Sequence, residues 1–276
     1  DLAGFSDIWL EGDIGLPATV DEDLSTKPTA QRVFQKLANL MGPLTTPEMK
    51  RNYLNFYGNL MKASDEYLVN VMAALKEQGL FDDTLIIRTS DHGEMGLSHG
   101  GVRQKNFNFY EETIRIPLIY SNPKLFPKAQ STGALVSHVD FLPTIASLFE
   151  APSTAKAAWA GTDYSSLVLN PKSKPVQDDV IFTYDDWQAG QASGPYVPPP
   201  QHIIGIREPR WKIAEYWDAT GDVPSQYEMY DLKTDPLESV NLAHPGHKRT
   251  PSQQAQYVRL RKKLETVKST RLQPLT

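Results

Sequence analysis

The spacing of apolar positions changes along the chain, and each spacing predicts a different kind of element. After Thr45, apolar residues recur at three- and four-residue steps, which predicts an amphipathic helix that ends at Gly79. The runs 84–90 and 116–121 are short and nearly all apolar, as in strands that are covered on both faces. A further helix is expected over 136–150. This order predicts an α/β fold containing part of a mainly parallel sheet, with helices on both of its faces.

The two ends of the chain differ from this central part. Residues 1–44 have little periodicity and predict an irregular surface segment with one short helix over 30–40. Composition shifts at Ala151 toward Ala, Ser, Lys and Pro. After it, closely spaced strands and an amphipathic terminal helix predict a small antiparallel sheet with a helix. The predicted strands are 180–184, 202–207, 211–216 and 226–232.

These patterns divide the chain into three parts. Residues 1–155 are expected to belong to a large α/β domain, 156–177 to a connecting segment, and 178–276 to a small C-terminal α+β subdomain. The start of the chain, which has no Met, reads as the interior of a longer polypeptide, so the absence of a targeting signal says nothing about location.

Composition narrows the classes of partner. The chain has 276 residues with 28 Lys and Arg against 33 Asp and Glu, a net charge of −5 that argues against nucleic-acid binding. There is no Cys, which rules out disulfides and thiolate metal sites. No apolar run approaches the ~20 residues that a membrane-spanning helix requires.

The candidate chemistry begins where the first apolar strand ends. Asp91 and His92 follow that strand at a glycine turn, and loops at strand ends form the ligand crevice of α/β sheets. A carboxylate oxygen and an imidazole nitrogen together suit a divalent cation. An isolated pair would equally fit an Asp that caps the turn and a His bonded to the backbone. The residues that follow favour the metal site.

Two further residues lie in the glycine-containing loop after this pair. Lys105 is placed to bind an oxygen of a sulfuryl or phosphoryl group and to stabilise charge that develops on it. His99 could donate a proton to a leaving group, or it could orient the loop through a backbone carbonyl. Glu94 and Arg103 are near enough in sequence to pair with each other.

These motifs together resemble the C-terminal portion of type I sulfatases, in the alkaline phosphatase superfamily. The matching pieces are residues 89–94, His99-Gly100, Lys105, residues 110–118, 139–144 and 230–238, and Asn241-Leu242. They occur in the family's order over residues from about 45 to 245. The resemblance implies the alkaline-phosphatase-like fold and an Asp-Pro-Leu-Glu turn in the small C-terminal subdomain.

The resemblance also implies a site. One divalent cation is expected, calcium first, with manganese or magnesium as alternatives because His92 supplies nitrogen where calcium prefers oxygen. Asp91 and His92 match metal ligands of the family, and Lys105 matches the lysine that contacts the sulfate. The family's formylglycine nucleophile arises in a Cys/Ser-x-Pro-x-Arg motif, which this chain lacks. The nucleophile is therefore expected on an N-terminal portion of the same enzyme.

The resulting hypothesis is the C-terminal portion of a metal-dependent hydrolase of sulfate esters, inactive as an isolated chain. Its expected partners are the N-terminal portion and a small-molecule or carbohydrate sulfate ester, with no membrane span. The alternatives are a phosphonate or phosphate ester hydrolase of the same superfamily and a non-catalytic sulfatase-like binding module. The family resemblance favours a periplasmic or secreted location.

Overall fold

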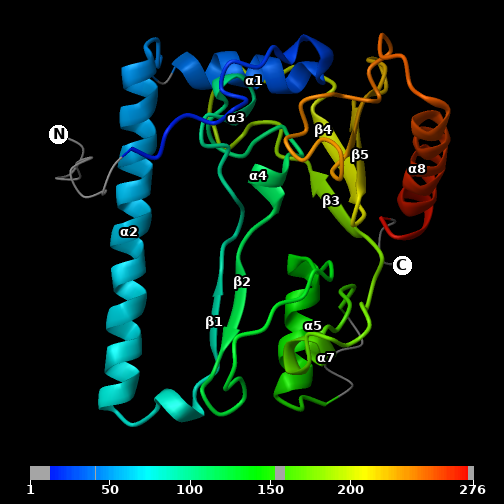
Figure 1. The fold of residues 1–276 in the computed structure, drawn as a ribbon. Helices are drawn as coiled ribbons and strands as arrows, with labels where there is room; N and C mark the ends of the chain where they lie inside the picture. Colours follow the sequence, from blue (N-terminus) through cyan, green and yellow to red (C-terminus); the bar gives the residue numbers. More distant parts are fainter. Residues whose placement is uncertain (1–12, 41, 153–158, 273–276) are drawn as a thin grey trace. The chain divides into compact units, whose positions relative to one another are not determined.

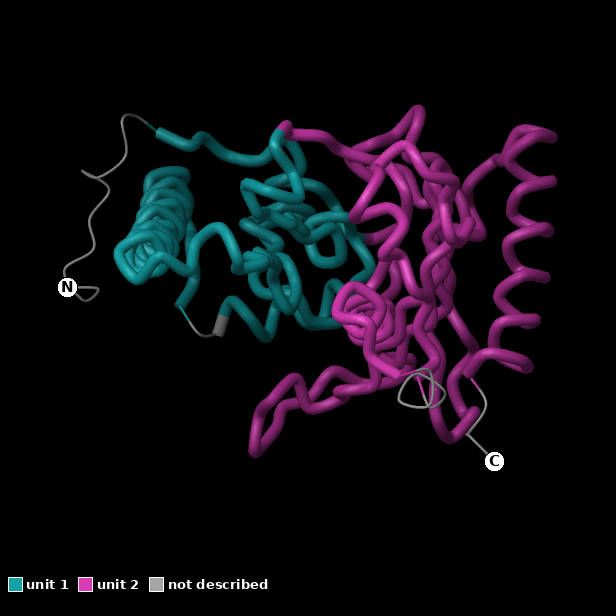
Figure 2. Tube along the Cα trace, turned by 90° about the horizontal axis from the view of Figure 1, so that it is seen from below, with its two compact units in different colours: residues 1–24, 31–127 teal, residues 25–30, 128–276 magenta. Residues whose placement is uncertain are grey.

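The computed structural model describes residues 13–40, 42–152 and 159–272, and the chain divides into two compact units (Figure 2). Unit 1 comprises the residues up to Leu24 together with Gln31–Pro127, and unit 2 comprises Ser25–Ala30 together with the residues from Lys128 onward. Residues 128–152 thus cluster with the C-terminal part. The domain boundaries expected at 155 and 177 stay predictions.

A long helix dominates unit 1. Helix α2, Pro47–Glu77, confirms the helix predicted after Thr45 (Figure 1). Its N-cap is Thr46, whose hydroxyl accepts a hydrogen bond from the backbone N–H of Met49 at 3.1 Å, so the helix begins one residue later than the pattern indicated. The first half of the helix buries Leu54. From Met61 onward the helix leaves several apolar side chains exposed: Met61, Tyr67, Val69 and Val71.

The described residues before α2 contain more buried structure than the sequence indicated. Helix α1, Thr29–Leu40, confirms the short helix expected over 30–40, and it buries Phe34 and Ala38. It follows the 3-10 turn η2, Leu24–Thr26. Thr19 and Val20, within the segment expected at the surface, are also buried.

The two strands predicted at 84–90 and 116–121 are present but shorter. Strand β1, Ile86–Thr89, follows the 3-10 turn η3, Phe81–Asp83, and pairs with β2, Leu118–Ser121. The pairing is antiparallel, with Ile87 opposite Tyr120. Neither strand is fully buried, and Ile119 is half exposed. The residues that the structure describes contain no parallel strand pair, so the mainly parallel sheet stays a prediction for the complete fold.

Two short helices lie between β1 and β2. Helix α3, Ser98–Gly101, contains residues with left-handed backbone angles, and helix α4, Glu111–Ile114, carries Glu111 and Glu112 in its single turn. Both belong to unit 1. They form the surroundings of the candidate site.

Unit 2 begins with the predicted helix at 136–150, which is divided into η4, His138–Asp140, and α5, Phe141–Leu148. Asp140 precedes α5, but its side chain makes no capping bond to that helix. Its carboxylate accepts hydrogen bonds from the backbone N–H of Ser137 at 2.8 Å, the backbone N–H of Thr162 at 2.7 Å and the side chain of Gln177 at 2.8 Å. Asp140 therefore fixes the region that contains α7, Ser165–Leu169.

The rest of unit 2 is the predicted antiparallel sheet with its helix. The strands lie in the order β3-β4-β5-β6, and helix α8, Pro251–Thr270, has a capping box formed by Thr250 and Gln253. The strands are β3 Val180–Tyr184, β4 His202–Arg207, β5 Trp211–Trp217 and β6 Gln226–Asp231. These bounds agree with the prediction to within one residue at each end.

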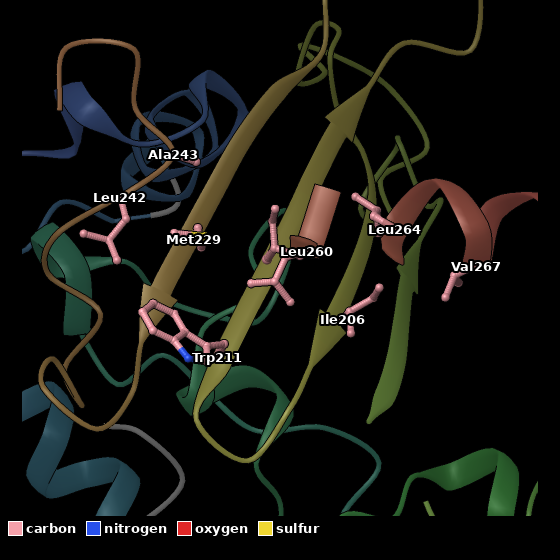
Figure 3. Packing of buried hydrophobic residues seen from close by; sticks show 9 residues of the cluster. Ile206, Trp211, Met229, Leu242, Ala243, Leu260, Leu264 and Val267 are labelled. Carbon is pink, nitrogen blue, oxygen red and sulfur yellow. The ribbon is translucent and has the colours of Figure 1, made fainter. Parts of the chain in front are cut away.

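The core of unit 2 lies between this sheet and α8. Figure 3 shows Leu260, Leu264 and Val267 of α8 packed with sheet residues such as Ile206 and Met229. Burying one aliphatic side chain of this kind contributes roughly 1.5–3 kcal/mol. Among the described residues, no helix has the length and hydropathy needed to cross a membrane.

Candidate functional site

Asp91 lies in the turn that leaves β1. Its Oδ1 atom accepts a hydrogen bond of 2.9 Å from the backbone N–H of His92, and that bond holds the pKa of Asp91 below its ordinary value. The side chain is 81% exposed, so the carboxylate stays ionised with an oxygen directed outward. The bond to the next N–H is the turn-capping role that the sequence left open for this residue.

His92 is oriented by the backbone. Its Nδ1 lies 2.8 Å from the carbonyl oxygen of Gly93, and a carbonyl can only accept, so Nδ1 carries the proton. In the neutral ring the lone pair then resides on Nε2, which lies 3.3 Å from Oδ2 of Asp91. Two electron-pair donors therefore face each other, and either a proton or a cation between them makes that approach favourable.

The approach of Nε2 to Oδ2 fits two neighbouring ligands of one divalent cation. Ligand atoms at ~2.1–2.5 Å from an ion and at right angles to one another lie about 3.0–3.5 Å apart. In this donor set the carboxylate oxygen suits calcium, magnesium or manganese, whereas the imidazole nitrogen is unusual for calcium and magnesium. The described residues contain no group of three or more His, Cys, Asp or Glu that could hold a metal ion, so any further protein ligands would come from elsewhere.

The turn is held against α4 by its glycine. The N–H of Gly93 donates a 2.8 Å hydrogen bond to the carbonyl oxygen of Thr113. A Cβ at Gly93 would lie 2.9 Å from the carbonyl carbon of Glu112 and would overlap its oxygen. Only glycine allows this contact, which fixes Asp91 and His92 relative to α4.

Lys105 is half-buried at the end of a narrow loop. The backbone of Met95 bonds to that of Gln104 at 3.0 Å, and that of Leu97 to Val102 at 3.0 Å. Lys105 makes no hydrogen bond or ion pair with any residue that the structure describes. A lysine whose ammonium group has no counter-ion among these residues is suited to receiving an anion.

Glu94 and Arg103, which the sequence placed near enough to pair, each bond to other groups. Glu94 accepts from the backbone N–H of Gln104 at 2.9 Å and from the hydroxyl of Tyr53 at 3.3 Å. Burial and then the Glu94 charge raise the pKa of Tyr53 to about 12. Arg103 donates to the carbonyl oxygen of Ala38 on α1. The two residues thus fasten the loop to α2 and α1, respectively.

His99 is completely buried between two carboxylates. Its Nδ1 lies 2.7 Å from Oε2 of Glu22, and its Nε2 lies 3.6 Å from Oε2 of Glu112. The ring stacks on Tyr110 at 3.6 Å between centroids, with 9° between the planes. The side chain therefore orients the loop through carboxylates rather than through a backbone carbonyl.

The acids around the ring determine its electrostatics. Burial by itself lowers the pKa of His99, but the neighbouring carboxylates of Glu112 and Glu22 outweigh it, so the pKa is raised above its ordinary value. Nδ1 makes a hydrogen bond to Glu22, whereas Nε2 faces Glu112 at 3.6 Å and makes no hydrogen bond with any residue that the structure describes. Burial raises the pKa of Glu112, but the proximity of His99 outweighs it and the net shift is downward. The predicted contacts of His99 and Lys105 with a substrate, and of Asp91 and His92 with a metal, stay predictions.

Two residues of this arrangement, Glu22 and Glu112, were not singled out by sequence reasoning. Glu112 lies in the motif at 110–118, which was noted only as a family feature. Glu22 comes from the segment expected at the surface. The one available signal was the burial-prone Thr19-Val20 pair beside an acidic run, which is too weak to place Glu22 against a loop 77 residues away.

Two family models match the chain. One, described as sulfatase, covers residues 17–151, and the other, described as N-sulphoglucosamine sulphohydrolase, C-terminal, covers residues 99–270. The second alone covers more than half of the chain. The chain belongs to the type I sulfatase family.

Individual relatives agree with this membership. N-acetylglucosamine-6-O-sulfatase of Bacteroides thetaiotaomicron is 29% identical over 218 residues, which are 77% of this chain and 36% of that protein. The structure of a protein in complex with its substrate D-glucosamine-2-N,6-O-disulfate superposes with a TM-score of 0.75 at 21% identity, covering 96% of this chain and 61% of the other. A phosphonate monoester hydrolase from Silicibacter pomeroyi gives a TM-score of 0.69 at 22% identity, covering 95% of this chain and 51% of the other.

The structural likenesses show that the chain has the alkaline-phosphatase-like α/β fold with a C-terminal antiparallel sheet and helix. The chain spans little more than a third of the length of the first curated relatives, 36% to 38%.

Proposed function

We propose that this chain is the C-terminal portion of a metal-dependent sulfatase that hydrolyses sulfate esters. The observation that carries the proposal is the joint placement of Asp91 and His92, whose Oδ2 and Nε2 atoms converge to 3.3 Å at the end of β1. Membership of the sulfatase family supports it. Lys105, in the loop that follows the turn, has no partner among the described residues, and its ammonium group would supply the complementary anion-binding group.

Each residue has a distinct task in this proposal. Asp91 and His92 would hold one divalent cation, whose chemistry is to orient an oxygen nucleophile and lower its pKa. Lys105 would bind a sulfate oxygen and balance the charge that grows on it as the ester bond breaks. Gly93 and Glu94 would keep the two groups in register by fixing the turn and the loop.

The substrate class that we propose is a carbohydrate sulfate ester. The relative from Bacteroides thetaiotaomicron is named for sulfate on N-acetylglucosamine, and the superposed complex holds a disulfated glucosamine. Both are amino sugars with sulfate at the 6-oxygen. A glucosamine 6-sulfate is therefore the first substrate to test.

The nucleophile would come from an N-terminal portion of the same enzyme. The chain has no Cys, and several apolar residues of α2, Tyr67, Val69 and Val71 among them, lie exposed in unit 1, as does Ile119 of β2. A larger sheet packed on these faces would cover them, and exposed apolar area of this kind is characteristic of an interaction surface. We infer that the N-terminal portion covers them and carries the formylglycine.

The test uses the full-length polypeptide that carries this chain, produced with its formylglycine. Sulfate release from glucosamine 6-sulfate is measured for the wild type, for Asp91→Asn and for Asp82→Asn, which alters an exposed acid of η3 in the same unit. We expect the wild type and Asp82→Asn to release sulfate at similar rates and Asp91→Asn to lose most activity. Equal rates for all three would remove Asp91 from the site.

A phosphonate or phosphate ester hydrolase is the second candidate. It is favoured by the nitrogen ligand His92 and by the likeness to a phosphonate monoester hydrolase, although that likeness shows the fold alone. The same preparation is therefore assayed on a phosphonate monoester, p-nitrophenyl phenylphosphonate, whose hydrolysis releases p-nitrophenol. A higher kcat/KM for the phosphonate than for every sulfate ester tested would favour this alternative, and no turnover of either class would favour the non-catalytic binding module.

A further inference from the structure

His99 is the most deeply buried titratable group of the candidate site, and nothing in the proposed reaction uses it. Its side chain is 0% exposed and lies against two acids. Burying a charged pair is costly unless its hydrogen bonds are satisfied. The arrangement therefore calls for a role that depends on the position of this ring.

The ring joins three separate pieces of unit 1. Glu22 comes from the segment before α1, Glu112 from α4, and His99 itself from α3 in the loop that leads to Lys105. The backbone is tied at the same place, because the N–H of His99 donates to the hydroxyl of Thr19 at 3.0 Å.

The neighbouring Gly100 continues this junction. Its N–H donates to the carbonyl oxygen of Thr19 at 2.8 Å, and its carbonyl accepts from the side chain of Gln35 on α1. A Cβ at Gly100 would lie 2.7 Å from the carbonyl oxygen of Glu22, and its φ is +75°. The backbone at 99–100 thus has little freedom to move while these contacts persist.

Glu112 extends the junction to the turn at the end of β1. Its carboxylate faces His99, while its backbone carbonyl packs against Gly93, next to Asp91 and His92. One residue thereby contacts the two loops that carry the candidate metal ligands and the candidate anion ligand. A change in the charge of His99 can be transmitted to both.

We propose that His99, held between Glu22 and Glu112, is a positioning residue that fixes the Lys105 loop relative to the Asp91–His92 turn. This inference rests on the proposed function only for its effect on catalysis. The clamp itself is a property of unit 1 that can be measured without a substrate.

The charges around the ring determine how the clamp responds to pH. The groups that face His99 are the carboxylates of Glu22 and Glu112 and the stacked phenol of Tyr110, while Thr19 and Gln35 are neutral. The pKa of His99 is raised above its ordinary 6.5, so its contribution is complete below pH 6.5 and is lost as pH rises through the folded-state pKa. Unprotonated His99 could bond to only one of the two acids.

The first experiment follows the loop directly in the full-length protein. Hydrogen exchange of the amides of 95–104 is measured by mass spectrometry as a function of pH, corrected for the intrinsic pH dependence of exchange. We expect protection to fall as His99 loses its proton, by about tenfold for the loss of one charge-assisted hydrogen bond.

Variants separate the clamp from a general effect of pH. His99→Gln and Glu22→Gln should lower protection at every pH and flatten its pH dependence. His202→Gln is the matched control, because it removes a His–carboxylate contact in unit 2, 3.0 Å between Nδ1 of His202 and Oδ1 of Asp185, and should leave the loop unchanged. If His99→Gln unfolds the chain, the titration of the His99 ring by NMR in the wild type and in Glu22→Gln decides instead.

The outcomes distinguish this inference from the proposed function. Suppose that amide protection of the loop depends on pH in the wild type, that this dependence disappears in His99→Gln, and that the protein has no sulfatase activity. This result would support the clamp and count against the proposed function. A sulfatase whose loop protection is the same in the wild type and His99→Gln at all pH values would overturn the clamp alone. The clamp would also be overturned if NMR gave His99 a pKa below 6.5 that did not change in Glu22→Gln.

Discussion

Gly93 packs against the backbone carbonyl of Glu112 so closely that no side chain fits between them. This contact joins the turn after β1 to α4, and the two candidate metal ligands lie immediately before it. We predict that Gly93→Ala displaces the turn and destabilises the protein by about 1–3 kcal/mol, the usual cost of overpacking. Thermal unfolding measures the loss. Gly133→Ala, where a Cβ meets nothing within 4 Å, is the matched control and should be nearly neutral.

Lys105 should matter for turnover and not for folding. The side chain has no partner among the residues that the structure describes, so Lys105→Ala removes no internal contact of its ammonium group. In the full-length enzyme we expect the activation free energy to rise by about 3–4 kcal/mol, as for one lost oxyanion donor, so that kcat falls. The melting temperature should be nearly unchanged. The exposed Lys128→Ala is the control. A stability loss with unchanged kcat would make Lys105 a structural residue.

The stability of unit 2 should depend on keeping both partners of a buried ion pair. Nζ of Lys212 lies 2.8 Å from Oε1 of Glu238, and both side chains are almost fully buried. Removing one partner leaves an uncompensated buried charge, so Lys212→Met should destabilise the protein by about 3–5 kcal/mol in urea unfolding. The double variant Lys212→Met, Glu238→Leu should recover part of this loss. A double variant less stable than either single variant would contradict this account.

Glu208 should make stability depend on acidity. Arg259 and Lys263 of α8 bond to its carboxylate at 2.6 Å each, and the bond from Arg259 is the main reason that the pKa of Glu208 is lowered. A depressed pKa means that this stabilisation is present above the ordinary value of 4.5 and is lost as pH falls through the folded-state pKa. We predict that Glu208→Gln has a lower free energy of unfolding than the wild type at pH 7, and that the difference between the two proteins is smaller at about pH 3. A constant difference at both pH values would argue against the ion pairs.

Much of the fold could be predicted from local patterns. The strands of unit 2 alternate with Pro, Gly and Asp turns, and α2 and α8 carry proline after a hydroxyl cap, so each element is encoded within its own segment. The direction of β2 relative to β1 is not encoded in this way. The apolar composition of the two strands indicates that other elements pack on both of their faces. It does not indicate which neighbouring strand each of them pairs with.

In the candidate site, too, residues in local motifs could be predicted and residues brought in by long-range contacts could not. Asp91, His92 and Lys105 stand in local motifs and could be selected from the sequence, while the acids on either side of His99 could not. Glu22 reaches His99 across 77 positions, through a segment whose own sequence shows no periodicity. Long-range contacts of single polar residues leave no periodic pattern, so they become visible only in the folded chain.

The measurement that tests the central claim most directly is the metal content of the full-length protein after exhaustive dialysis, determined by elemental mass spectrometry. The account predicts about one divalent cation per polypeptide in the wild type and in Lys105→Ala, and a large loss in Asp91→Ala and His92→Ala. Retention of a full equivalent of metal in both Asp91→Ala and His92→Ala would contradict the assignment of the turn after β1 as a metal-binding half-site.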